Sequence, residues 1–205
     1  EAWLAAATGK DEARDIHIKT TGTARGLDPA VFGSPLAGSI NGKFDANGRL
    51  GKNWSGTGGV VLEQSTLSNA PLWGHARLGG SAQRISSADV DLHIGPNVIA
   101  AKGKFGAPSD RLDWRIDAPQ LAVLGGDFGG VLRGSGTLSG TAQAPALTAA
   151  LEGQNVKVLG RHQVKALRAS ANIGARQGGA TPMVSNVEIT GYASGDTRID
   201  SARLQ

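Results

Sequence analysis

The stretch RLDWRIDAPQLAVLGGDFGGVLRGSGTLSGTAQAPALTAALEGQNVKVLG, residues 111–160, decides the fold. Its apolar residues recur at every second position, as in Leu112, Trp114 and Ile116, and charged or small polar residues stand between them. Such alternation places apolar side chains on one face of a β-strand and polar side chains on the other. The stretch therefore predicts two-faced strands, and the same pattern recurs along the chain.

Thirteen segments show this alternation, with glycine, proline and Asn-Gly between them. They are residues 15–23, 35–44, 58–63, 73–78, 88–95, 98–105, 110–118, 130–142, 146–153, 156–160, 164–174, 184–193 and 197–204. Helix is expected only as a turn or two within residues 1–14 and as a short helical or irregular crossover within 118–125. The pattern predicts an all-β protein.

Two local irregularities are predicted within this pattern. Asp45-Ala46-Asn47-Gly48 is expected to form a tight hairpin turn, because Asn-Gly supplies the two residues with positive φ that such a turn needs. Near Ala166 and Leu167 the alternation slips by one position, and a β-bulge is the simplest cause.

The composition limits the classes of function. Glycine accounts for 31 of 205 residues and aromatics for only 4 %, so the apolar faces consist mainly of Leu, Val, Ile and Ala. The net charge of +4 is spread, because acidic and basic residues alternate within the same strands, and we expect no nucleic-acid partner. The chain has no cysteine, which excludes disulfides and thiolate metal sites.

Residue patterns typical of catalysis are missing from the sequence. The four histidines lack the spacing of a metal site, and neither Gly-x-Ser-x-Gly nor Gly-x-Gly-x-x-Gly occurs. Asp113 and Asp117 resemble a carboxylate pair, but Arg111 and Arg115 alternate with them, so cross-strand salt bridges explain them better. We therefore expect a protein that is not an enzyme and that uses no cofactor and no metal.

The motifs resemble one known family. LDWRIDAPQLAVL is followed by LRGSGTLSGTAQAPAL and then by LEGQNVKVLG. In this order they resemble the repetitive β region of the TamB-like proteins, translocation and assembly modules of the AsmA-like superfamily. The resemblance covers roughly residues 49–174 and suggests an internal section of that region.

The resemblance implies a fold and a location. It implies an elongated, bent, taco-like antiparallel or mixed sheet with a hydrophobic concave groove. Residues 1–205 would form a single elongated β domain, a fragment of a longer protein that spans the periplasm of a diderm bacterium. The full-length protein would be anchored in the inner membrane. Parts outside this fragment would contact an Omp85-family outer-membrane barrel, TamA-like.

The resemblance also implies a function. The groove would bind phospholipid tails and conduct phospholipid between the inner and outer membranes, supporting outer-membrane biogenesis. The alternative is a scaffold or chaperone that assembles outer-membrane β-barrel proteins or autotransporters by strand pairing.

The expected lipid-binding residues are apolar members of the alternating segments. They are Val90, Leu92, Ile94, Leu112, Trp114, Ile116, Leu132, Leu138, Leu147, Leu151, Val156, Val158, Ile173, Val187 and Ile189. Periodicity alone also allows a filled sandwich, in which such residues pack on one another and Trp114 anchors the core. Gly134, Gly136 and Gly140 share a face and favour a space that protein does not fill.

Overall fold

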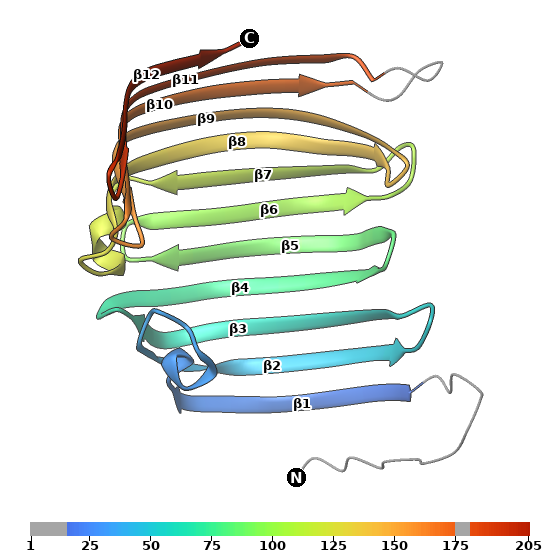
Figure 1. The fold of residues 1–205 in the computed structure, drawn as a ribbon. Helices are drawn as coiled ribbons and strands as arrows, with labels where there is room; N and C mark the ends of the chain where they lie inside the picture. Colours follow the sequence, from blue (N-terminus) through green and yellow to red (C-terminus); the bar gives the residue numbers. More distant parts are fainter. Residues whose placement is uncertain (1–15, 175–180) are drawn as a thin grey trace, which may run out of the picture.

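The structure is a computed structural model that describes residues 16–174 and 181–205. These residues form one antiparallel sheet of twelve strands in sequence order, each paired with the next (Figure 1). The strands are β1 (Ile16–Leu27), β2 (Gly38–Leu50), β3 (Ser55–Leu67), β4 (Ala70–Ser81), β5 (Arg84–Ile94), β6 (Asn97–Phe105), β7 (Arg111–Ala118), β8 (Gly129–Thr141), β9 (Ala144–Val158), β10 (His162–Ile173), β11 (Met183–Ser194) and β12 (Thr197–Leu204).

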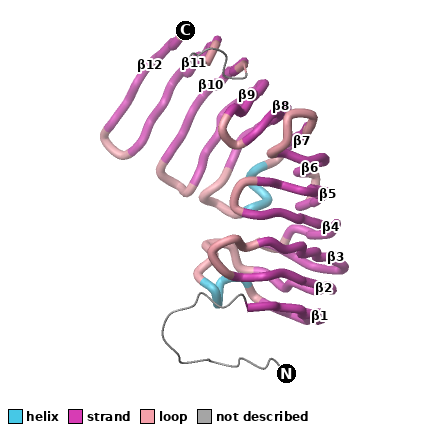
Figure 2. Tube along the Cα trace, turned by 90° about the vertical axis from the view of Figure 1, so that its right-hand side faces the viewer, coloured by secondary structure: helices cyan, strands magenta, loops and turns pink. Residues whose placement is uncertain are grey.

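The sheet is bent and does not close. Figure 2 shows it curving from β1 to β12, and within the described residues each of these two strands pairs on one side only. Two short 3₁₀ helices, η1 (Pro29–Phe32) and η2 (Leu121–Leu124), lie on the side towards which the sheet bends. The predicted elongated, bent all-β fold is confirmed, and η2 confirms the short crossover expected within residues 118–125.

One face of the sheet carries continuous apolar rows, because paired residues of antiparallel neighbours point to the same side. One row crosses β5 to β12 through Leu92, Ile99, Ile116, Gly134, Leu151, Ala169, Val187 and Leu204. Beside it, a second row crosses β3 to β10 through Val60, Ala76, Val90, Ala101, Trp114, Gly136, Ala149 and Ala171. We call the side that carries these rows the apolar face.

The opposite side carries a row of alternating charge, which we call the charge ladder. It crosses β7 to β12 through Asp117, Arg133, Glu152, Arg168, Glu188 and Arg203. Its members form ion pairs of 3.1 Å between Arg133 and Asp117, 3.4 Å between Arg168 and Glu152, and 2.7 Å between Arg203 and Glu188. Opposite charges placed directly across neighbouring strands favour this register over a slipped one.

Reversing one charge of the ladder should destabilise the sheet. Arg168→Glu would place three carboxylates side by side on β9, β10 and β11, and we expect a loss of about 1 kcal/mol, because each exposed pair contributes about 0.2–1 kcal/mol. The urea unfolding midpoint measures this loss. Adding Glu152→Gln should restore part of it, because it removes one of the two like-charge contacts of the new Glu. Arg161→Glu, in the turn before β10, changes net charge equally, and an equal shift there would contradict the role of the ladder.

The strand count differs from the prediction at one place. The predicted segments 146–153 and 156–160 are a single strand, β9, and Asn155 lies within it at φ +48°. The predicted helical turn within residues 1–14 lies outside the described residues.

The predicted hairpin turn at Asn47-Gly48 is wrong. Both residues lie inside β2, where Gly48 pairs with Ile18 on one side and with Gly56 on the other. A Cβ on Gly48 would lie 3.1 Å from the Cα of Gly56, so this glycine permits close approach of two strands. Pairing on both sides outweighs the local turn preference, and the turn follows at residues 51–54.

The predicted β-bulge at Ala166 and Leu167 is also wrong. β10 keeps one register with β9 and with β11 through this point, so no residue is inserted. The residues opposite Lys165 in that register are Asn155 at φ +48° and Gly191 at φ +63°. At this point the side chains of β9, β10 and β11 therefore exchange faces together, while each residue keeps its partner in the neighbouring strand.

Candidate functional site

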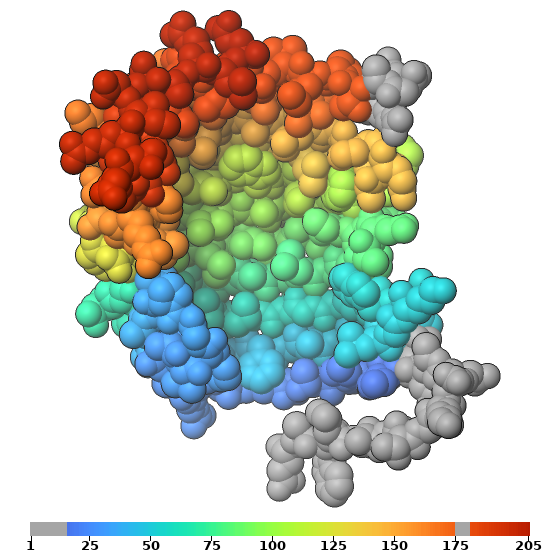
Figure 3. Space-filling view, viewed as in Figure 1, coloured from blue at the N-terminus to red at the C-terminus, as the bar shows by residue number. Residues whose placement is uncertain are grey.

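The apolar face is the concave face of the sheet. Leu121 of η2 packs with Ala118 and Val156, and Ile116 and Leu132 pack against this small cluster. Since η2 lies on the inner side of the bend, the residues that it contacts line that side. Figure 3 shows this side hollowed, bordered by the C-terminal strands in red and by the segment around η1 in blue.

All fifteen predicted groove residues lie on this concave apolar face. Twelve of them follow from the strand pairing that includes Leu112 and Ile116. Val156 follows from its packing with Ala118 and Leu121, and Ile94 and Val158 follow by alternation from Leu92 and Val156. The structure therefore places the predicted set on one continuous surface. Their contact with lipid remains a prediction.

The residues that the structure describes leave most of this surface uncovered. Within residues 16–174 and 181–205 there is no second sheet, and no large side chain is fully buried. Of the fifteen predicted residues only Val156 is buried, where η2 covers the face. The filled-sandwich alternative is therefore wrong for the described part of the chain.

Trp114 fills the space above two of the inner glycines. A Cβ on Gly136 would lie 2.7 Å from two carbons of the indole ring, and one on Gly134 would lie 3.4 Å from a third. The expectation that these glycines leave unfilled space is therefore wrong at these two positions. Trp114 smooths this part of the concave face, which is typical of an aromatic ring covering a glycine in the neighbouring strand.

A further set of apolar residues was not predicted. A cavity of about 430 Å³ opens at the ends of β1 to β5, and its apolar side chains are Ile18, Ala46, Leu50, Trp54, Leu78 and Ile85. Ala46 and Leu50 escaped prediction because the misread turn at Asn47-Gly48 ended the second strand too early. The alternation Gly56, Gly58, Val60, Leu62 is the signal that extends β3 to this region.

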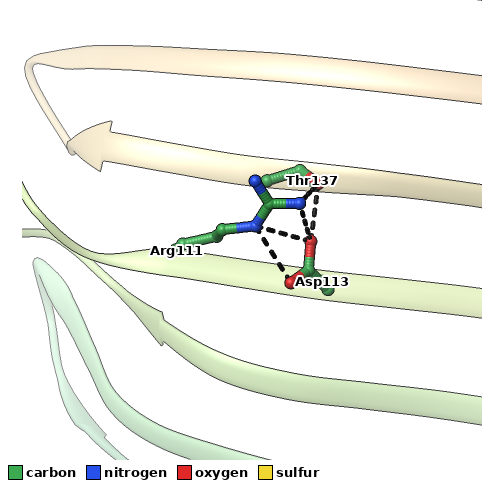
Figure 4. A network of polar contacts seen from close by, with 3 residues as sticks. All are labelled: Arg111, Asp113 and Thr137. Carbon is green, nitrogen blue, oxygen red and sulfur yellow. Dashed lines mark hydrogen bonds and ion pairs between the residues drawn. The ribbon is translucent and has the colours of Figure 1, made fainter.

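The convex face neutralises its own charges. Arg111 Nε donates to both oxygens of Asp113 at 3.0 Å, and the hydroxyl of Thr137 donates to Asp113 at 2.6 Å (Figure 4). The hydrogen bond from Arg111, then that from Thr137, lowers the pKa of Asp113. The carboxylate is therefore ionised at neutral pH and held by its neighbours.

Asp117 is held in the same way. Arg133 of β8 and Arg115 of its own strand contact its two oxygens at 3.1 and 2.6 Å, and the hydrogen bond from Arg133 is the larger cause of its lowered pKa. The expected cross-strand salt bridge is therefore confirmed for Asp117, whose partner across the strands is Arg133. It is wrong for Arg111 and Arg115, which pair with Asp113 and Asp117 within β7. This arrangement does not resemble a catalytic carboxylate pair, in which the two groups have opposed pKa shifts.

The comparisons with known proteins agree with the geometry. The family model described as TamB, N-terminal domain, matches residues 13–205. Searches of curated proteins and of solved structures found no match. None of the helices in the described residues has the length and apolar character to cross a membrane. Because the match covers nearly the whole chain, including every strand of the bent sheet, the chain belongs to the TamB family.

Proposed function

We propose that the apolar face binds phospholipid tails and conducts phospholipid between the inner and outer membranes of a diderm bacterium. The family consists of translocation and assembly modules rather than enzymes, and such proteins belong to the bacterial envelope. One observation carries the proposal: apolar rows cross strand after strand on the uncovered concave side, while the convex side carries the charge ladder.

The dimensions of the apolar face suit acyl chains. Neighbouring strands lie about 4.8 Å apart, so a row that crosses eight strands spans ~34 Å. An acyl chain spans about 15 Å, half of a bilayer core. Each methylene removed from water contributes about 0.8 kcal/mol, and the rows repeat similar residues along their length. A tail would therefore find overlapping sites of similar affinity, which favours sliding over storage.

The proposal includes the setting of the full-length protein. It would be anchored in the inner membrane and work with a TamA-like Omp85-family barrel in the outer membrane, contacted by other parts of the protein. The head groups would remain in water, above the concave face, while the tails follow the rows.

A second candidate function is strand pairing with outer-membrane β-barrel proteins or autotransporters. In the described residues, the outer edges of β1 and β12 have no neighbouring strand, and an edge can add a strand through its backbone groups. This function would use the edges of the sheet, whereas lipid binding would use its apolar face.

Native mass spectrometry tests the lipid proposal directly. The domain, purified without detergent from a diderm host, should carry extra mass equal to one or more phospholipids, and solvent extraction should remove it. A refolded sample prepared without lipid is the control, and incubation with phospholipid vesicles should restore the adduct. A preparation that has only the mass of the protein, before and after incubation with vesicles, would contradict the proposal.

A further inference from the structure

The cavity at the ends of β1 to β5 differs from the rest of the apolar face. Its floor is backbone, because Gly48, Gly56 and Gly80 pair in one row across β2, β3 and β4, and Gly58 lies in the next row. Side chains stand around this floor, and Leu78 and Trp54 remain 51 % and 45 % exposed. The cavity volume of about 430 Å³ lies in the range of small-molecule sites.

Gly58 has no packing reason to be glycine. An added Cβ would lie 3.6 Å from the nearest atom, the carbonyl oxygen of Asp45, which is ordinary contact, and its φ is not in the positive region. A side chain there would point into the cavity. The missing side chain therefore keeps space open on the concave side.

The cavity also has a charged rim. Among the described residues that line it, Arg84, the first residue of β5, is the charged one, and its side chain is 50 % exposed. Its Nη2 lies 3.4 Å from a carboxylate oxygen of Asp110, longer than a strong charge-assisted hydrogen bond. A guanidinium has five donors, so Arg84 can bind a further anion.

We propose that this cavity is a seat for one acyl chain of a phospholipid, with the lipid phosphate bound to Arg84. The inference rests on the proposed lipid function and gives it a defined position. From Ile18 on β1 to Ile85 on β5 the cavity crosses four strand spacings, or ~19 Å, enough for one acyl chain. The glycine floor makes the seat deeper than the continuous rows beyond it, so a tail should dwell here longer than elsewhere.

Quenching of Trp54 fluorescence tests the seat. The probe is phosphatidylglycerol with brominated tails, supplied from vesicles, and the signal from Trp54 is the difference between the wild-type protein and Trp54→Phe. Gly58→Leu should reduce this quenching at least tenfold at a given lipid concentration, because the side chain occupies the floor. Leu78→Trp adds an indole ring at the wall of the cavity and should reduce the quenching of Trp54 to the same extent. Its Trp54 signal is again the difference between the protein with Trp54 and the protein with Trp54→Phe.

Two controls accompany these variants. Gly59→Leu adds the same side chain one residue further on, towards the opposite face, where it meets the flexible side chain of Arg77, and it should leave quenching unchanged. Arg84→Gln should weaken binding of the brominated phospholipid about tenfold, the effect of one hydrogen bond to a charged group. It should leave binding of a brominated diacylglycerol unchanged, because that lipid has no phosphate.

The outcomes separate the seat from the wider function. Unchanged quenching in both Gly58→Leu and Leu78→Trp overturns the seat, even if phospholipid still copurifies with the domain. Quenching by a brominated fatty acid but not by the phospholipid overturns the assignment of the occupant. A third outcome is that one lipid binds per protein and that Gly58→Leu removes it. This result supports the seat and contradicts conduction along the rows.

Discussion

Replacing Ile116 with arginine is expected to abolish the association of phospholipid with the central part of the sheet. Ile116 lies in the row that crosses β5 to β12, between Ile99 on β6 and Gly134 on β8. A guanidinium at this point would have to lose water beside an acyl chain, and the burial of an unpaired charge is among the costliest changes in an apolar site. Leu92→Arg, two strands away in the same row, should have the same effect.

The measurement is the amount of phospholipid per protein after purification without detergent, by native mass spectrometry and by phosphate analysis of the extract. Ala100→Arg is the matched control, because Ala100 pairs with Asp91 and Arg115 on the convex side. It adds the same charge to a neighbouring strand but should leave lipid unchanged. If folded Ile116→Arg and Leu92→Arg keep as much lipid as Ala100→Arg, conduction along the apolar face is excluded.

The same variants separate the two candidate functions. Neither Ile116 nor Leu92 lies on β1 or β12, so the backbone groups at the two outer edges are unaffected. A protein that acts by strand pairing should therefore keep its activity in Ile116→Arg. A protein that acts through its concave face should lose it.

The alternation of residues was sufficient to predict which side chains share a face. In residues 111–160 the period of two runs through β7 and β8 and through β9 as far as Gly153, and strand pairing keeps the apolar positions on one face. Beyond Gly153 the period slips by one residue, and Val156 remains on this face, where it packs with Ala118 and Leu121. Every predicted groove residue consequently lies on one side. Alternation cannot show what covers that side, since a sandwich and an open sheet have the same period. The family resemblance favoured the open form, and the structure confirmed it.

Predictions from short sequence motifs were wrong where pairing with neighbouring strands determines the backbone conformation. Asn47-Gly48 has a strong turn preference, but β2 has partners on both sides, and twelve residues of pairing outweigh one dipeptide. Ala46 and Leu50 of the cavity beside it were missed for the same reason. Trp114 above Gly136 could not be foreseen either, because the contact depends on which residue of β8 lies opposite Trp114.

Gly103→Ala is expected to cause one of the largest losses of stability among single substitutions on the apolar face. Gly103 has φ +135°, and an added Cβ would overlap the carbonyl oxygen of Arg111 in the neighbouring strand. The unfavourable backbone conformation costs about 1–3 kcal/mol and the steric overlap about 1–3 kcal/mol. The expected loss of about 2–6 kcal/mol is a large part of the total for a domain, about 5–15 kcal/mol.

Urea unfolding followed by far-ultraviolet circular dichroism measures this loss, with Gly58→Ala as the matched control. Gly58 lies on the same face, but its Cβ would make ordinary contact, so alanine there should leave the midpoint unchanged or raise stability by about 0.4–1 kcal/mol through the unfolded state. Equal midpoints for the two variants would show that the backbone at Gly103 relaxes freely. Gly103 pairs with Leu112, so the backbone strain at an alanine there would act on the pairing of β6 with β7, in the middle of the twelve-stranded sheet. Gly103→Ala should therefore lose phospholipid at lower urea concentrations than Gly58→Ala.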